Sequence, residues 1–360
     1  MNSPATQIVD EPAPVRAGEE LDGAKVDAAI KLVLPGLSGS PEIREFPRGA
    51  SNLTYLVRYP ERELILRRPP SGYKAKSAHD MRREFTIISA LKPVYPYVPK
   101  VIAFFDDPEI MGCDFYLMER IRGMIVRRDL PQQLHFSRAE TRRLCLNVID
   151  KLIELHQLDY KAAGLEQIGK GKGYVQRQIS GWSDRYRKSH TADTGDFEEV
   201  LRWLSANMPA EDSATCIIHN DFRFDNAVLN PENPFEVIGV LDWEMATIGD
   251  PLMDLGNSLA YWVQADDDAF FQMTRTQPTH VPGMLTRREV VEYYAKRTGR
   301  AIERFDFYLI YGLFRLAVII QQIYYRYFHG QSRNPAFADF GKLVNYLQQR
   351  CERLIAQPVL

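Results

Sequence analysis

The chain carries IIHNDFRFDNAVLN at residues 217–230 and, shortly after it, VIGVLDWEMATIGDPLMDL at residues 237–255. In these stretches Asn226 follows Asp221 by five positions, and Asp242 follows Asn226 by sixteen. The apolar segments 227–229 and 237–241 predict two short strands of a hairpin. If these strands pair, Asn226 and Asp242 converge on one point, and Asp221 lies on the loop before them.

Two carboxylates and an amide at this spacing suit the transfer of a phosphoryl group from Mg·ATP to a hydroxyl. Such a site needs little covalent chemistry from the protein, but it must neutralise phosphate charge and orient the acceptor. We expect Asp242 to be the main ligand of Mg²⁺, which prefers hard oxygen donors, and Asn226 to add a neutral oxygen. Asp221 would accept the hydrogen bond of the acceptor hydroxyl and then its proton. ATP and Mg²⁺ are therefore the expected cofactors.

The motifs resemble those of the aminoglycoside phosphotransferase and choline kinase superfamily. The catalytic loop of that family reads H-G-D with an Asn five residues after the Asp, and this chain has His219, Asn220, Asp221 and Asn226 in those places. The family's metal motif is an apolar strand that ends in D-W/F-E, and residues 242–244 match it. The ordered set is far more specific than an isolated Asp and Asn, which are common in turns.

The match continues through ATIGDPLMDL (246–255), and it reaches back to GASNLTYLV (49–57) and forward to FRLAVIIQQIYYRYFHG (314–330). The two outer segments are most similar to the kinase-like domain of acyl-CoA dehydrogenase family members 10 and 11. The resemblance covers about nine-tenths of the chain. It implies an α+β, bilobal protein-kinase-like fold, with a small N-terminal lobe built on an antiparallel sheet and a larger, mainly helical C-terminal lobe.

One histidine and two aspartates near the catalytic loop are expected to support the loop without taking part in the reaction. In the family, the residue at His219 packs beneath the loop and hydrogen-bonds backbone, which is also the ordinary role of a histidine after an apolar strand. Asp250 and Asp254 lie near a predicted helix start, where carboxylates satisfy free N–H groups.

The nucleotide is expected to meet the N-terminal lobe at its first turn. The loop between the first two predicted strands lies where a phosphate-covering turn would be, and its candidates for phosphate contacts are Gly49, Ser51 and Asn52. One glycine in a hairpin ordinarily supplies only the turn. The resemblance, in which an SN-T-Y segment follows this loop, favours the phosphate role.

The third predicted strand has arginines where kinases place a lysine. Alignment with the family's V-L-R pattern selects Arg67 as the phosphate ligand and Glu84 as its partner, although Arg67 and Arg68 on an edge strand could both be surface charges. A hinge is predicted after the apolar strand that ends at Met118, which would close the back of the adenine pocket. The Glu119 carbonyl and the Ile121 N–H would then reach adenine.

Length and composition agree with a two-lobed enzyme. The chain has 360 residues, a length that exceeds the usual size of one domain, and 45% of them are hydrophobic, which is enough for a substantial core. We expect a disordered tail at residues 1–20, an N-terminal lobe at 21–118, and a hinge and helical lobe with the acceptor site at 119–360. A poorly periodic loop that begins at residues 266–268 is expected to be a flexible insertion near that site.

Charge and hydropathy narrow the class of protein. Forty-seven acidic and forty-five basic residues leave a net charge of −2, which favours neither a nucleic-acid partner nor a polybasic membrane surface. No run of about eighteen apolar residues and no secretory signal is visible, so a cytoplasmic location is expected. The four cysteines lack CxxC spacing, which argues against a zinc site or a disulfide scaffold.

The acceptor remains open at this point. Arg315 and Arg326 lie eleven residues, about three turns, apart on one predicted helix, and they could bind an anionic group of the acceptor or form salt bridges inside the lobe. We lean toward a hydroxy acid or hydroxyacyl thioester, as the resemblance implies. An aminoglycoside or a choline-like amino alcohol is the alternative acceptor. The only sequence feature that supports an aminoglycoside is the acidic cluster at residues 266–268. A nucleotide-binding pseudokinase is the third hypothesis, supported by Arg67 and by Asn220 in place of glycine. Neither the oligomeric state nor the choice between ATP and GTP follows from the sequence.

Overall fold

Two units divide the chain in the computed structural model, which describes residues 9–46, 52–70 and 80–360. The sheet unit consists of Met1–Val126, Ala163–Ile168 and Asn226–Ala246. The helical unit consists of Arg127–Ala162, Gly169–Asp225 and Thr247–Leu360. The expected lobe boundary after residue 118 stays a prediction, because compactness groups the hairpin of residues 226–246 with the N-terminal sheet.

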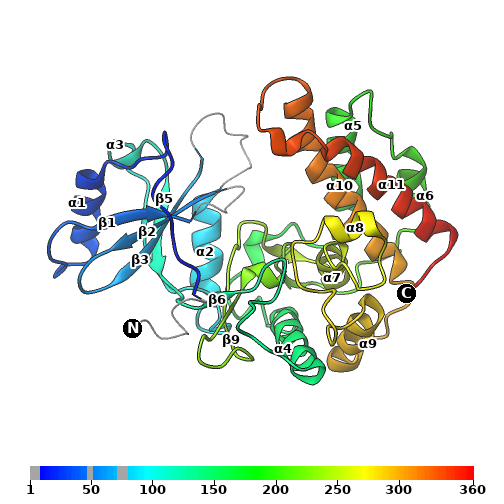
Figure 1. The fold of residues 1–360 in the computed structure, drawn as a ribbon, viewed down its shortest axis with the longest axis horizontal. Coiled ribbons are helices and arrows are strands. Elements are labelled where there is room, and N and C mark those ends of the chain that lie inside the picture. Colours follow the sequence, from blue (N-terminus) through cyan, green and yellow to red (C-terminus); the bar gives the residue numbers. More distant parts are fainter. Residues whose placement is uncertain (1–8, 47–51, 71–79) are drawn as a thin grey trace. The chain divides into compact units, whose positions relative to one another are not determined.

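The sheet unit is built on five antiparallel strands in the order β1-β2-β3-β5-β4 (Figure 1). The strands are β1 (Glu42–Glu45), β2 (Leu53–Arg58), β3 (Glu63–Arg68), β4 (Val101–Phe105) and β5 (Phe115–Glu119). Its other elements are α1 (Gly23–Val33), α2 (Met81–Leu91), α3 (Pro108–Met111), β6 (Met124–Ile125), η2 (Glu166–Ile168), β8 (Ala227–Leu229) and β9 (Val237–Val240). The predicted strand pair of residues 227–229 and 237–241 is present as β8 and β9.

The alternation of side chains along the strands gives the sheet two different faces. One face packs against α1 and forms an apolar core that includes Val26, Tyr55 and Leu117. Successive side chains of a strand point to opposite faces, so Arg67 and Tyr116, which are register partners on β3 and β5, share the other face. Helix α2 lies on that second face, where Phe85 contacts the Tyr116 ring edge-on at 6.0 Å.

The predicted disordered tail is wrong for residues 9–20. Ala13 pairs with the edge strand β1, since its N–H donates to the Glu45 carbonyl at 2.8 Å and its own carbonyl accepts from the Glu45 N–H at 2.9 Å. Arg16 forms an ion pair with the buried Glu45 carboxylate, and the Tyr55 hydroxyl donates to the Glu19 carbonyl at 2.8 Å. Backbone pairing with an open sheet edge needs no hydrophobic periodicity, so the sequence gave no sign of it. Residues 1–8 lie outside the described chain.

The helical unit surrounds the long apolar helix α10 (Asp306–Phe328), which packs against α5, α7 and α11. The remaining helices and strands are α4 (Arg138–His156), α5 (Tyr174–Ser189), α6 (Glu198–Ala206), β7 (Cys216–Ile218), β10 (Thr247–Gly249), α7 (Pro251–Ala260), α8 (Ala269–Met273), α9 (Arg287–Thr298) and α11 (Phe340–Ala356). Three-residue turns of 3₁₀-helix occur at η3 (Phe224–Asn226) and η4 (Pro335–Phe337). Within the described ranges, α10 is the one helix whose length and mean hydropathy of 1.4 would suit a membrane span, but 72% of that window is buried in the protein.

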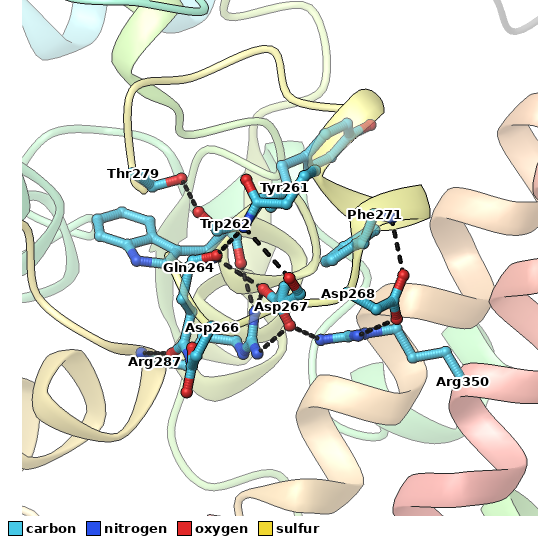
Figure 2. A network of polar contacts seen from close by, with 12 residues as sticks. Tyr261, Trp262, Gln264, Asp266, Asp267, Asp268, Phe271, Thr279, Arg287 and Arg350 are labelled. Carbon is cyan, nitrogen blue, oxygen red and sulfur yellow. Dashed lines mark hydrogen bonds and ion pairs between the residues drawn. The ribbon is translucent and has the colours of Figure 1, made fainter. Parts of the chain in front are cut away.

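The expected flexible loop at residues 266–268 is instead fixed by ion pairs, as Figure 2 shows. The Asp267 carboxylate accepts two hydrogen bonds from Arg287, at 2.7 and 2.8 Å, and one from Arg350 at 2.5 Å. Asp268 caps α8 through the Phe271 N–H at 3.0 Å. Burial would raise the pKa of Asp267, but the Arg287 hydrogen bonds and the two arginine charges outweigh it, and the pKa is lowered. These acidic groups are thus committed to holding the loop.

Helices α7 and α10 cross at two glycines. A Cβ atom on Gly312 would lie 2.2 Å from the Gly256 carbonyl oxygen. A Cβ atom on Gly256 would lie 2.3 Å from the Tyr308 carbonyl oxygen. Both contacts are to backbone, which cannot swing away. The glycines therefore set how closely the two helices approach.

Gly312→Ala should destabilise the protein by about 1–3 kcal/mol, because the added methyl group forces the two backbones apart. Gly181→Ala in α5 is the matched control, since its Cβ would meet only the Arg185 side chain, at 3.6 Å. That variant should gain roughly 0.5–1 kcal/mol from helix propensity. Urea unfolding measures both, and equal stability of the two variants would contradict this account of the crossing.

Candidate functional site

In the helical unit, the loop that carries the predicted base is held by the carboxylate of Asp254. Strand β7 pairs with β10 and ends at Ile218, directly before the loop. The backbone N–H groups of His219 and Asn220 each donate to Asp254 at 2.7 Å, to different oxygens. The Nε2 atom of His156 lies 3.0 Å from the carboxylate. Asp254 is fully buried, so three hydrogen bonds replace its lost hydration.

The electrostatics of Asp254 follow from these contacts. Burial would raise the pKa of the Asp254 carboxyl, but the hydrogen bond and charge of His156 and the contacts with His219 outweigh burial and lower it. Asp250 is the expected N-cap of α7, since it accepts from the N–H groups of Leu252 and Met253 at 2.8 and 3.0 Å. The sequence suggested that Asp254 satisfies N–H groups at the start of its own helix. Its carboxylate instead accepts from the loop N–H groups of His219 and Asn220.

Asn220, in the place of the family glycine, is compatible with an intact loop. Its φ angle is +65°, in the left-handed region that asparagine tolerates better than most residues. Its side-chain oxygen accepts from the Tyr174 hydroxyl at 3.3 Å and from Asn257 Nδ2 at 3.1 Å. The asparagine therefore supplies the backbone conformation for which glycine is otherwise used.

The side chain of Asp221 is only partly buried and has a positive charge beside it. Its backbone N–H donates to Nδ1 of the buried His219 at 3.3 Å, which agrees with the supporting position expected for that histidine. The Nε atom of Arg223 lies 3.4 Å from an Asp221 oxygen and 3.3 Å from Asp225, and the Arg223 guanidinium lies over the Tyr261 ring at 4.7 Å. Sequence reasoning missed Arg223, although its place two residues after the predicted base was a signal.

In the sheet unit, the predicted hairpin brings Asn226 and Asp242 together. Ala227 pairs with Val240, and the Leu241 N–H donates to the Asn226 carbonyl at 2.8 Å, so the two candidate metal ligands flank the same end of the ladder. The buried Trp243 anchors the turn by donating from Nε1 to the Val240 carbonyl at 2.9 Å. Asp242 has a φ angle of +68°, a strained conformation for a non-glycine residue that is typical of functional sites.

Arg67 links the hairpin to the five-stranded sheet. Its Nη2 donates to Asp242 at 2.6 Å and lies 3.7 Å from Glu244, while its Nε donates to Glu84 at 3.2 Å. Glu244 in turn accepts from Asn52 Nδ2 at 2.6 Å. The structure thus brings together Arg67, Glu84, Asp242 and Asn52, all expected at the nucleotide site. Gly49 and Ser51 lie outside the described residues.

The pKa values of the two buried partners, Arg67 and Glu84, are both raised, for different reasons. Burial lowers the pKa of Arg67, but the charges of Glu84, Asp242 and Glu244 outweigh it and the net shift is upward. Burial raises the pKa of Glu84, and the Arg67 charge offsets this only in part. We take Arg67 as charged, since three carboxylates surround it.

The oxygen donors of this cluster suit a divalent cation. Asp242 offers a carboxylate, Asn226 an amide oxygen, and Glu244 a second carboxylate that shares the Arg67 guanidinium. Mg²⁺ is ordinarily held by one or two carboxylates, with phosphates and water completing its shell. No larger His, Cys, Asp and Glu cluster that could hold a metal occurs among the described residues. The residues present therefore fit Mg²⁺ bound together with a nucleotide.

The hinge residues occupy the end of β5 in the sheet unit. Met118 is buried, and the Glu119 N–H donates to the Lys100 carbonyl at 2.8 Å. The Glu119 side chain pairs with Arg62 at 3.1 Å. Ile121 packs on Gly239, whose added Cβ would approach its Cδ1 to 2.9 Å. The backbone contacts to adenine stay a prediction.

Arg315 and Arg326, which lie on the same helix α10, differ in burial. Arg315 is buried, with its guanidinium 5.1 Å from the Trp182 ring centroid, whereas Arg326 is exposed near the end of α10. A shared subsite of Arg315 and Arg326 stays a prediction, and the different burial of the two side chains does not favour it. Helical spacing places the two arginines on a similar face of α10. Neighbouring parts of the protein cover that face at Arg315 but not at Arg326.

A protein family and several individual proteins are similar to this chain. A family profile described as "Phosphotransferase enzyme family" matches residues 42–290. The chain is 34% identical to mouse acyl-CoA dehydrogenase family member 10 over 89% of its own length, and 31% identical to human acyl-CoA dehydrogenase family member 11 over 94%. It spans only 30% of the mouse protein and 43% of the human protein.

Solved structures confirm the protein-kinase-like fold. A Ralstonia eutropha JMP134 protein, described as a candidate aminoglycoside phosphotransferase, aligns with a TM-score of 0.78 and 28% identity over 93% of this chain and 98% of its own. Choline kinase from Cryptosporidium parvum Iowa II aligns with a TM-score of 0.65 and 13% identity over 94% and 98%. The expected superfamily resemblance is thereby confirmed.

Asp254→Asn should lower the free energy of unfolding by about 2–4 kcal/mol at pH 7, because an amide presents one acceptor oxygen and an NH₂ that opposes a backbone N–H. The folded pKa of Asp254 lies below its unfolded value of about 3.9. Its stabilisation is therefore complete above about pH 5 and is lost as the pH falls through the folded pKa. Urea unfolding at pH 7 and at acid pH should show a gap between variant and wild type that narrows in acid. A gap that does not change with pH would contradict this role.

Arg67→Met should cost about 3–5 kcal/mol, because Glu84 stays buried without its partner. The double variant Arg67→Met/Glu84→Leu should recover most of that loss but not nucleotide affinity. Arg58→Met is the control, since its ion pairs are half-exposed and should be worth about 0–1 kcal/mol. Unfolding and Mg·ATP titration separate the two roles, and a double variant that binds nucleotide as tightly as wild type would rule out Arg67 as a phosphate ligand.

Proposed function

Because this chain belongs to the phosphotransferase enzyme family, we propose that it transfers the γ-phosphoryl group of ATP to a hydroxyl of a small organic acceptor. The observation that carries this proposal is the convergence of Asn226 and Asp242 beside Arg67. Asp221, the proposed base, precedes Asn226 by five residues on a loop fixed by Asp254. The metal-holding residues and the base are all retained, which supports catalysis over a nucleotide-binding pseudokinase.

Each side chain has a distinct task in the proposed reaction. Asn226 and Asp242 would hold Mg²⁺, which would neutralise phosphate charge, while ATP would supply the γ-phosphoryl group and leave as ADP. Arg67, a planar donor suited to phosphate oxygens, would bind the nucleotide phosphates. Asp221 would accept the acceptor hydroxyl proton on its carboxylate. His219 and Asp254 would keep that carboxylate in place through the loop backbone.

For the acceptor we propose a hydroxy acid or a hydroxyacyl thioester. The two relatives named above carry acyl-CoA dehydrogenase in their names, which points to acyl chemistry. The acidic residues 266–268 were the feature that favoured a polycationic aminoglycoside, and Asp267 is neutralised internally by Arg287 and Arg350. An anionic acceptor therefore has more support than a cationic one.

Asp221→Asn should reduce kcat by about 10²–10⁴-fold, because the amide cannot take the proton, while Mg·ATP affinity stays within about twofold of wild type. Asp242→Ala should instead weaken Mg·ATP binding itself. Asp266→Asn is the control, since this exposed aspartate contacts only its neighbour Gln264 among the interactions described. Coupled ADP release and nucleotide titration measure both quantities. Transfer by Asp221→Asn at the wild-type rate would remove Asp221 from the role of base.

A further inference from the structure

Two basic residues of the helical unit, Arg275 and His280, lie beside the carboxylate of Asp129. Arg275 Nη2 is 3.6 Å from an Asp129 oxygen, and His280 Nε2 is 3.9 Å from the same oxygen. Both distances exceed hydrogen-bonding range, and Asp129 is 64% exposed. The aspartate is thus a loose partner for two more deeply placed nitrogen groups.

The Arg275 guanidinium presents one edge that the protein does not satisfy. Its Nη1 donates to the carbonyl and the side-chain oxygen of Gln272, at 2.9 and 3.1 Å, which fixes the plane of the group. Its Nε is buried and has no hydrogen-bond partner among the described residues. The Nε and Nη2 groups form the fork that binds a carboxylate or phosphate with two parallel hydrogen bonds. Among the described residues, the carboxylate that pairs with this fork is Asp129, at 3.6 Å from Nη2.

His280 adds a second unsatisfied group at the same place. Its Nδ1 is buried and likewise lacks a hydrogen-bond partner in the described part of the chain. Burial, together with the positive charges of Arg275 and Arg128, lowers the pKa of His280 against the opposing charge of Asp129. Buried nitrogen groups are rarely left without a hydrogen-bond partner in native proteins, so two such groups on residues that share Asp129 as a neighbour indicate a missing partner.

The pair of Arg275 and His280 is attached to the loop that carries the proposed base. Gln277, between Arg275 and His280, is buried and accepts from the Phe224 N–H at 2.8 Å. Its Nε2 donates to the Tyr261 carbonyl at 3.3 Å. Phe224 follows Asp221 by three residues, which limits their Cα separation to about 11 Å. The segment that carries Arg275 and His280 therefore packs directly on the segment that follows Asp221.

We propose that Arg275 and His280 form an oxyanion subsite that binds a carboxylate or phosphate of the phosphate acceptor, with Asp129 as a competing internal anion. The inference rests on the proposed function for the identity of the ligand as acceptor. It also replaces the pair Arg315 and Arg326 as the source of selectivity for anions. The shared chemistry has two sources, the carboxylate of a free hydroxy acid and the phosphates of a coenzyme A thioester.

Calorimetric titration without nucleotide tests the subsite independently of transfer. The probes are straight-chain hydroxy carboxylates with diols of equal length as neutral counterparts, and coenzyme A with pantetheine as its neutral counterpart. Wild type should bind at least one anion about tenfold more tightly than its counterpart. Arg275→Gln should abolish this preference, Arg275→Lys should keep part of it, and Asp129→Asn should increase it several-fold. The anion that shows the preference identifies the source.

The controls separate this proposal from the proposed function. Arg202→Gln, an exposed arginine on α6, should leave the preference unchanged. Equal binding of anions and neutral counterparts by wild type, or a wild-type preference in Arg275→Gln, would overturn the subsite even if phosphoryl transfer is observed. If Arg275→Gln does not fold, Asp129→Asn decides, and unchanged or weaker anion binding by that variant would overturn the proposal. An anion preference that behaves as predicted would stand even if no acceptor were phosphorylated.

Discussion

The buried carboxylate of Asp254 holds the loop on which the proposed chemistry depends. It receives the N–H groups of His219 and Asn220 together with His156, and so fixes the backbone immediately before Asp221. Asp254 belongs to α7, whose start is capped by Asp250 and whose distance from α10 is set by contact at glycines. A change in the packing of α7 therefore shifts the proposed base without touching it. The packing of α7 and the position of the proposed base are therefore linked through Asp254.

A different constraint operates in the sheet unit, where one guanidinium faces three carboxylates. Arg67 holds Glu84 on one side and Asp242 and Glu244 on the other, so the cluster has more carboxylates than guanidinium groups. That excess favours a divalent cation, and the phosphates of a nucleotide would offer Arg67 new partners. Arg67 reaches this place because strand alternation turns it toward the face covered by α2. Arg67, which the family alignment selected as the phosphate ligand with Glu84 as its partner, is therefore the centre of the cluster.

Local patterns in the sequence predicted the fold and much of the site. The spacing of Asn226 and Asp242 around a short predicted hairpin indicated that the two residues converge. Contacts between distant segments were not predictable in the same way. Asp254 looked like a helix cap because the residues that it binds lie 34 and 35 positions earlier. Asp267 meets arginines 20 and 83 residues away, and the pairing of Ala13 with β1 uses backbone groups that leave no pattern. Helical spacing suggested a shared site for Arg315 and Arg326, but tertiary cover buries only the first of them.

The most direct test of the account is mass spectrometry of an acceptor panel incubated with Mg²⁺ and ATP that carries ¹⁸O in its γ-phosphoryl group. The panel contains short and long hydroxy acids, hydroxyacyl-coenzyme A esters, amino alcohols and aminoglycosides. The account predicts a product that gains the labelled phosphoryl group on its hydroxyl oxygen, among the anionic members of the panel. Labelled product from cationic acceptors alone would contradict the proposed acceptor class. Tight binding of Mg·ATP without any labelled product would contradict phosphoryl transfer itself and favour a nucleotide-binding protein.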